Sequence, residues 1–155
     1  MNNLICVNFS SHDPRHKECL EIRKKVFVQE QHVPEDLDVD EYEDKSEHFL
    51  VLRNDNPIGT GRFRVYVNFL KFERLCILQS ERGKGTGAFL VKQMQKKGFQ
   101  EHPNLLQIGG AQVSALGFYK KLGWTPIGKV FMDAGIEHKL IIFAPKQENQ
   151  INESI

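Results

Sequence analysis

A glycine-rich turn carries the strongest chemical signal in this sequence of 155 residues. It consists of Arg82, Gly83, Lys84, Gly85, Thr86 and Gly87, and it lies between a predicted strand and a predicted helix. Glycine allows a sharp turn whose N–H groups converge, and the following helix adds free N–H groups and its positive dipole end. The turn therefore predicts a cradle for a phosphate or pyrophosphate group. The alternative is an ordinary tight turn whose basic side chains point into water.

Two common nucleotide-binding motifs do not fit this turn. A P-loop needs Ser or Thr directly after a Gly-Lys pair, and another glycine five residues before that pair. Here Gly85 follows Lys84, and Leu78 stands at the earlier position. A Rossmann fingerprint read from Gly85 and Gly87 needs Gly or Ala where this chain has Leu90. We therefore expect the phosphate-bearing ligand to bind in another way.

Cysteine and histidine residues offer two further kinds of chemistry. Cys76 lies in a predicted strand and could act as a nucleophile in a two-step transfer, although a strand cysteine more often fills apolar core space. His12, His16 and Cys19 have spacings that suggest a metal ion. A helix that starts after His12 would keep these three residues off a common face, so we expect no metal site.

The cysteine count, the first residues and the charge bear on compartment and partners. Three cysteines without a C-x-x-C pair fit poorly with a secreted disulfide framework. We see no signal peptide, and no apolar run approaches the roughly 18 residues of a membrane span. We expect a soluble, cytoplasmic protein with no membrane partner. The formal net charge of +1 argues against nucleic acid as a partner, because nucleic-acid binders usually carry a large basic excess.

The elements that must position these groups follow the order β-α-(α)-β-β-β-α-β-α-β-β. Predicted strands cover residues 4–9, 48–53, 58–67, 70–78, 105–108, 124–131 and 136–143, and predicted helices cover 13–29, 88–98 and 114–122. Short turns between residues 48 and 78 predict an antiparallel meander, while the later strand-helix-strand units suit parallel pairing across right-handed crossovers. The predicted class is α/β, a mixed, largely antiparallel central sheet with parallel splayed strands and helices on both faces. We expect one domain over residues 1–144 and a polar tail over 145–155.

Four segments together resemble the GNAT superfamily of N-acetyltransferases. Arg82-x-x-Gly85-x-Gly87 after a strand resembles the coenzyme A pyrophosphate motif of that family. Residues 114–124 resemble its second signature, a Phe-Tyr pair on a short helix followed by glycine and an aromatic residue. Residues 22–34 resemble the first helix of small bacterial members of the YjcF/ElaA-like type, and residues 131–138 resemble their closing hairpin, with Asp133 where Glu is expected. The resemblance spans roughly residues 4–144.

The resemblance implies direct transfer of an acetyl group from acetyl-CoA to a primary amine of a small molecule or peptide. Backbone N–H groups across residues 82–87 would anchor the pyrophosphate. The strand that ends at Leu75, Cys76 and Ile77 would splay from the strand at 105–108 and hydrogen-bond the pantetheine arm as an added strand would. An N–H near Cys76 or Ile77 would polarise the thioester carbonyl. Gln112 and Phe118 are the other expected cofactor contacts.

Two side chains receive catalytic roles from the same resemblance. Tyr119 is the expected general acid, because a phenol with a reference pKa of about 10 holds a proton at neutral pH; the alternative is a core aromatic residue. Glu73 is the expected base, directly or through a water, on the interpretation that it shares strand parity with Leu75 and Ile77. The alternatives for Glu73 are a structural ion pair with a nearby arginine and proton loss to bulk water.

An acidic segment at residues 35–44 stands where the family forms an acceptor-site wall. It holds seven of the chain's 20 acidic residues and no Lys or Arg, which leaves 21 basic residues against 13 acidic ones elsewhere. We expect an exposed loop or short helix that could attract a cationic amine such as a polyamine, an amino sugar or a lysine; the alternative is a solvated loop. The rival function is a non-catalytic acyl-CoA sensor on the same fold. The acyl chain preference and a homodimer are left open.

Overall fold

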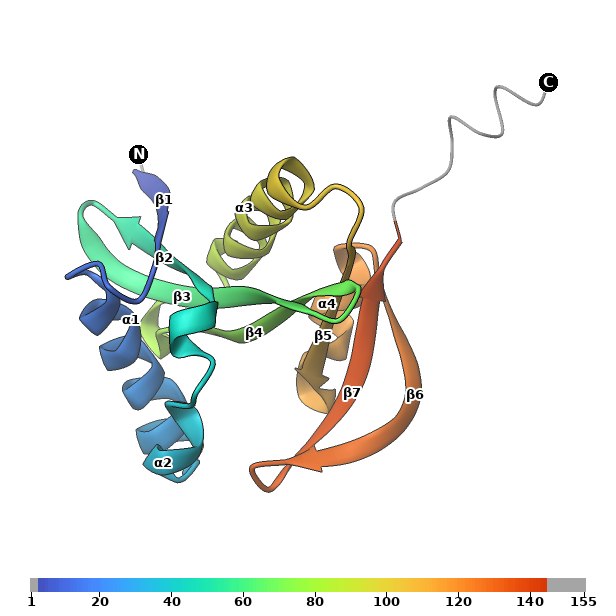
Figure 1. The fold of residues 1–155 in the computed structure, drawn as a ribbon. Coiled ribbons are helices and arrows are strands. Elements are labelled where there is room, and N and C mark those ends of the chain that lie inside the picture. Colours follow the sequence, from blue (N-terminus) through green and yellow to red (C-terminus); the bar gives the residue numbers. More distant parts are fainter. Residues whose placement is uncertain (1–2, 145–155) are drawn as a thin grey trace.

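The computed structural model describes residues 3–144 and contains a seven-stranded sheet in the order β1-β2-β3-β4-β5-β7-β6 (Figure 1). The strands are β1 (Leu4–Phe9), β2 (Glu47–Arg53), β3 (Asn56–Tyr66), β4 (Phe69–Ile77), β5 (Leu106–Gln112), β6 (Trp124–Asp133) and β7 (Ile136–Phe143). The helices are α1 (His16–Arg23), α2 (Glu35–Asp38), α3 (Thr86–Glu101) and α4 (Leu116–Lys121), with a π-helical segment η1 (Lys24–Glu30) and 3-10 turns η2 (Glu43–Lys45), η3 (Gln79–Glu81) and η4 (Val113–Ala115). The predicted mixed α/β class is confirmed. The predicted tail at 145–155 lies outside the described residues.

Strand β2 shows that the sheet is covered on both faces, with α1 and α2 on one side and α3 on the other (Figure 1). Phe49 and Val51 belong to the core beneath α3, whereas Leu50 and Leu52 pack with α1. All four are at most 2% exposed. A strand buried on both faces reads as a continuous apolar run rather than as an alternation. Among the helices of residues 3–144, none combines the length and apolar character that crossing a bilayer requires.

The first helix begins slightly later than predicted and changes character before it ends. Asp13 lies in the turn before α1, where its carboxylate accepts the Arg15 N–H at 2.8 Å. From Lys24 to Glu30 the helix continues as the wider η1, which closes with a bond from the Gln31 N–H to the Val26 carbonyl. This widened turn brings Glu30 and Gln31 to the open side of β4.

A bulge in β4 reverses the side on which its side chains point. Arg62 of β3 pairs with Glu73, but Thr60 pairs with Cys76, so β4 carries one extra residue between the two pairs. Arg74 has a φ of +58° at this point, as expected for an irregular strand position. Glu73 therefore points toward α1, whereas Leu75 packs into the core under α3. The predicted shared parity of Glu73 with Leu75 and Ile77 is wrong for this reason.

Strands β4 and β5 are parallel neighbours for a short stretch and then separate. Their pairing runs from Phe69 with Leu106 to Phe72 with Gly109 and ends there. A Cβ at Gly109 would lie 3.1 Å from the Phe72 carbonyl oxygen, so glycine permits the last close approach of the two strands. The predicted splay is confirmed.

The C-terminal half differs from the prediction in how its strands pair. β7 lies between β5 and β6 and is antiparallel to both. As predicted, β6 runs parallel to β5. The two strands are not neighbours, however, because β7 lies between them. The prediction ended β5 at residue 108, but the strand continues through Gly109 and Gly110 to Gln112. Gly123, with φ +96°, has the left-handed conformation that commonly ends a helix.

Candidate active site

A pocket of about 360 Å³ opens where β4 and β5 separate. Its walls come from the end of η1, from β4 and β5, from α4 and from the β6–β7 hairpin. Residues singled out from the sequence that line it are Glu73, Leu75, Cys76, Arg82, Gln112 and Tyr119. The fold thus brings together side chains that are spread over almost 50 positions of the sequence.

The glycine turn leads into α3 and has the geometry of an anion site. Gly83 and Gly85 have φ angles of +77° and +81°, which residues with a side chain disfavour. The first N–H that α3 satisfies by itself is that of Phe89, which donates to the Gly85 carbonyl at 3.0 Å. The helix N–H groups before it find no backbone acceptor within residues 3–144. They point outward from the positive end of a 16-residue helix.

Gly87 lets α4 approach this turn closely. A Cβ at Gly87 would lie 3.2 Å from the Phe118 ring and 3.9 Å from the Ile77 side chain. The three predicted contacts therefore meet at one place, between the glycine turn and the end of β4. The side chain of Thr86 points away from this place, since its buried hydroxyl accepts a hydrogen bond from Arg53 at 3.1 Å.

The two basic side chains of the turn are paired with carboxylates at the surface. Arg82 donates two hydrogen bonds to Glu30, at 2.6 and 2.8 Å, and a third to the Ile77 carbonyl at 3.0 Å. Lys84 lies 3.2 Å from Glu81. The hydrogen bond from Arg82 is the main reason why the pKa of Glu30 lies below its usual value. An arriving anion would have to compete with Glu30 for Arg82.

Tyr119 lies on α4 and faces the pocket. Its ring packs edge-on against Phe118 and Trp124, with centroids 5.0 and 6.1 Å apart. Its hydroxyl has no hydrogen-bond partner among the described residues. Burial is the main cause that raises the pKa of Tyr119 to about 12. The phenol therefore holds its proton at neutral pH, as a general acid must before it reacts.

Glu73 also lines the pocket, but arginines occupy its carboxylate. It accepts hydrogen bonds from Arg62 at 3.1 Å and Arg64 at 2.9 Å, and Lys71 lies 3.4 Å away. Burial alone would raise the pKa of Glu73, but the Arg64 hydrogen bond and the three positive charges outweigh it and hold the pKa below its usual value. The ion-pair alternative describes this residue. A carboxylate held in this way is a poor proton acceptor at neutral pH.

Three of the seven carboxylates in the acidic segment 35–44, those of Asp38, Asp40 and Glu43, belong to a largely buried ionic network, whereas Glu35, Asp36, Glu41 and Asp44 are exposed, as we expected for this segment. Asp38 is 4% exposed and Glu43 is 7% exposed. The buried Arg23 donates to both, at 3.2 Å to Asp38 and 2.7 Å to Glu43. Arg62, also buried, pairs with Asp40 and Glu43 as well as with Glu73. These carboxylates are neutralised internally, so they lack the free charge that a cationic acceptor would need.

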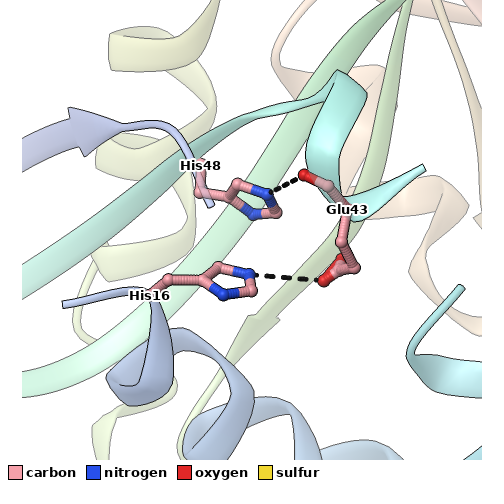
Figure 2. Close-up of side chains that lie close together, drawn as sticks. All are labelled: His16, Glu43 and His48. Carbon is pink, nitrogen blue, oxygen red and sulfur yellow. Dashed lines mark hydrogen bonds and ion pairs between the residues drawn. The ribbon is translucent and has the colours of Figure 1, made fainter. Parts of the chain in front are cut away.

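His16, Glu43 and His48 form a compact cluster at the edge of this network (Figure 2). His48 Nε2 lies 2.9 Å from the Glu43 carbonyl oxygen, and His16 Nε2 lies 3.3 Å from the Glu43 carboxylate. The rings pack edge to face with centroids 4.4 Å apart. Three such ligands could suit a metal ion, but Arg23 and Arg62 already hold the same carboxylate. The two guanidinium groups that contact the Glu43 carboxylate would repel a divalent cation bound there. We therefore interpret the cluster as part of the ionic network.

Two other sequence hypotheses have clear structural outcomes. Cys76 is buried in the core beside α1, and burial raises the pKa of its thiol, which disfavours a thiolate nucleophile. Cys19 also lies in that core, with Sγ 3.9 Å from the Phe49 carbonyl oxygen. His12 is exposed, while His16 turns toward Glu43. The structure therefore does not bring His12, His16 and Cys19 together.

Sequence reasoning missed Arg23 and His138, and it considered Arg62 only as one possible ion-pair partner of Glu73. Arg23 stands directly beside the apolar stripe of the first helix, and Arg62 alternates with apolar residues along β3. A charged residue at a core position predicts a buried partner, and the nearby acidic segment offers seven candidates. His138 lines the pocket from β7; it ends the segment that resembles the family's closing hairpin, but that resemblance gave it no role.

Comparison with known proteins identifies the family. A family model described as an acetyltransferase (GNAT) domain matches residues 11–139. YjcF of Bacillus subtilis, described as an uncharacterized N-acetyltransferase, is 39% identical over 123 residues, which cover 79% of this chain and 87% of that protein. The crystal structure of Escherichia coli ElaA matches with a TM-score of 0.81 at 22% identity, covering 90% of this chain and 99% of the other.

A structure with a bound acyl donor shares this fold. A GNAT family acetyltransferase from Elizabethkingia anophelis, solved with acetyl-CoA bound, matches with a TM-score of 0.64 at 17% identity and covers 90% of this chain and 95% of the other. At such identities the solved structures show the fold, while the family model and YjcF show the relationship. The resemblance found in the sequence is confirmed. The chain belongs to the GNAT family of acetyltransferases, enzymes that transfer an acyl group from acyl-CoA.

Proposed function

We propose that this enzyme transfers the acetyl group of acetyl-CoA directly to a primary amine of a small molecule or peptide. The observation that carries the proposal is the arrangement at the opening between β4 and β5. The N-terminus of α3 with its glycine turn lies at one end of the opening, and the protonated phenol of Tyr119 faces the pocket. Acetyl transfer from acetyl-CoA would use both features, because the pyrophosphate needs N–H donors and positive charge and the departing sulfur needs a proton.

The pyrophosphate of coenzyme A would bind to the glycine turn. The N–H groups at the start of α3 would donate to its oxygens, and the positive helix end would favour its charge. Arg82 and Lys84 would add positive charge by exchanging Glu30 and Glu81 for phosphate oxygens. Gly87, Phe118 and Ile77, which meet beside the turn, would contact the next part of the cofactor.

The pantetheine arm would lie along the unpaired edge of β4. Beyond Phe72 this edge has no neighbouring strand within residues 3–144, so an extended amide chain could bond to it as a strand would. Leu75, Cys76 and Gln112 line the pocket there. An N–H of β4 near Cys76 or Ile77 would polarise the thioester carbonyl. Tyr119 would then donate its proton to the departing sulfur.

The acidic segment 35–44 bears on the acceptor only in part. Asp38, Asp40 and Glu43 each pair with arginine, so only the exposed carboxylates of Glu35, Asp36, Glu41 and Asp44 could attract a cationic amine. The proposal therefore rests on the catalytic geometry and leaves the rest of the acceptor open.

A thiol-release assay with acetyl-CoA and a panel of primary amines tests the function. We expect release with at least one amine, and the Tyr119→Phe variant should lower kcat about 100-fold while its affinity for CoA stays unchanged. The Phe118→Leu variant is a matched control in the same helix, and it should change CoA affinity more than kcat. Binding of acetyl-CoA without release for any amine would favour the acyl-CoA sensor instead. Absence of CoA binding in calorimetry would overturn both functions.

A further inference from the structure

Two side chains that line the pocket could accept a proton and have no role so far: Asp133, which is exposed at the tip of the β6–β7 hairpin, and His138 on β7, which the structure holds in place. A proton acceptor is needed because an alkyl amine is largely protonated at neutral pH and its ammonium form cannot attack a thioester. Glu73 is held by two arginines and a lysine. Asp38, which also lines the pocket, is held by Arg23 and Arg74.

The imidazole of His138 is fixed in one tautomer. Its Nδ1 lies 2.7 Å from the carbonyl oxygen of Ile136. A carbonyl oxygen can only accept, so Nδ1 carries the hydrogen and donates it. In the neutral ring the lone pair is therefore on Nε2. No group among residues 3–144 forms a hydrogen bond with that nitrogen, so it is available to a ligand.

Packing holds the ring in place as well. The ring of Phe131 stacks on it, with centroids 5.8 Å apart and planes 27° apart. Phe131 lies over Gly110, where an added Cβ would be 3.5 Å from the phenyl ring. His138 is opposite Phe131 on β6 and opposite Gln112 on β5, so the three side chains share one face of the sheet.

That face is the opposite one from the face occupied by Tyr119. Ala111, the neighbour of Gln112 in β5, packs into the core under α3, and Tyr119 packs against the same core. Side chains alternate along a strand, so Gln112 and its partner His138 point to the α1 side. Tyr119 and His138 therefore reach the pocket from opposite faces of the sheet. An acid for the leaving sulfur and a base for the entering nitrogen need such separate positions.

We propose that Nε2 of His138 is the proton acceptor for the amine in this reaction. The inference rests on the proposed acetyl transfer to an amine. The ammonium gives one proton to Nε2, and the freed lone pair forms the C–N bond as the C–S bond breaks. Tyr119 gives its proton to the sulfur, and the second proton that the nitrogen loses returns to the phenolate through solvent. The proton on His138 leaves to water, so the net reaction releases one proton when the amine enters as its ammonium.

The variant His138→Asn separates the catalytic role from a structural one. An asparagine N–H can still donate to the Ile136 carbonyl, as Nδ1 does, but asparagine offers nothing at the position of Nε2. We expect kcat with an amine found in the panel to fall about 100-fold or more. Melting temperature and the calorimetric Kd for CoA should stay at the values of the unchanged protein. The exposed His12→Asn is the matched control and should keep full activity.

A second variant tests the same step by chemical rescue. His138→Ala should lose at least as much activity as His138→Asn, and added imidazole should restore part of it by entering the space of the ring. His138→Asn activity within threefold of the unchanged protein would overturn the inference and leave the proposed function intact. Loss of CoA binding together with activity in His138→Asn would also overturn it in favour of a structural role. If the unchanged protein binds CoA but acetylates no amine, the proposed function fails and takes this inference with it.

Discussion

Arginine–carboxylate pairs occur in two regions of this molecule, and their surroundings differ. At the glycine turn, the side chains of Arg82 and Glu30 are 39% and 32% exposed. Beneath α1, the side chain of Arg62 is 0% exposed, and the side chains of its partners Glu43 and Glu73 are 9% and 10% exposed. An exposed pair contributes up to about 1 kcal/mol and can exchange partners. A buried pair cannot lose one member without leaving an unpaired charge in the interior.

The exposed and the buried arginine–carboxylate pairs therefore have different roles, although their chemistry is similar. The exposed pair at the turn is suited to a site where an anionic ligand replaces a carboxylate. The buried network is suited to a rigid wall, and it removes Glu73 from the set of groups able to accept a proton. The wall opposite, on β5, β6 and β7, contains no such network among the described residues and leaves His138 with a free lone pair.

The largest effect should come from breaking the buried network. Arg62→Met leaves Asp40, Glu43 and Glu73 without their shared partner, and the free energy of unfolding should fall by about 3–5 kcal/mol. Arg82→Met should change it by less than about 1 kcal/mol. Urea unfolding followed by circular dichroism measures both. Equal effects of the two variants would contradict the distinction between the buried and the exposed pair.

A second way to test the network is acid, which acts on its carboxylates together. Arginine partners hold the pKa values of Asp40, Glu43 and Glu73 below their usual range, against the opposing effect of burial. These groups bind protons less readily in the folded chain than in the unfolded one. Their stabilisation is complete above the unfolded pKa of about 4–4.5 and is lost as the pH falls through the lower folded values.

As far as these three carboxylates determine it, the melting temperature should stay constant from pH 7 to about pH 5 and fall steeply below pH 4.5. The Glu73→Gln variant should fall less steeply, because one of the three titrating groups is absent. Glu35→Gln, which removes an exposed carboxylate, is the control and should follow the unchanged protein. A steep fall of the same size in all three proteins would assign acid sensitivity to other groups.

How far the sequence could predict this molecule depends on whether a feature is local. The first strand, the meander and the glycine turn follow from short-range rules and agree with the structure. The insertion of β7 between β5 and β6 depends on which edges meet in three dimensions, and short-range rules do not contain that information. The family signatures also located the turn and the Phe-Tyr helix correctly, because each signature is a short run of neighbouring residues.

The errors at the site have a common physical origin. One extra residue at the Arg74 bulge reverses the side on which Glu73 points, so the period of two fails there. Asp38, Asp40 and Glu43 of the acidic segment were expected to be exposed like its other carboxylates, because its charges were counted without the buried Arg23 and Arg62, which lie 12 or more residues away in the sequence. His138 lies in the segment that resembles the closing hairpin, but its suitability as a proton acceptor depends on the Ile136 carbonyl and the Phe131 ring, which only the folded hairpin brings to it.

The smallest expected effect tests whether the exposed pair truly exchanges. Glu30→Gln removes the carboxylate that competes with phosphate for Arg82, so CoA should bind roughly two- to fivefold more tightly at low ionic strength. Glu35→Gln changes the net charge equally, at a carboxylate that pairs with Lys24 instead, and should leave the Kd unchanged. Calorimetric titration of both variants at low and high salt measures the effect, and the gain should shrink as salt screens the charges. Weaker binding by Glu30→Gln would mean that Glu30 holds Arg82 in place for the ligand, and that even the exposed pair acts as part of a fixed frame.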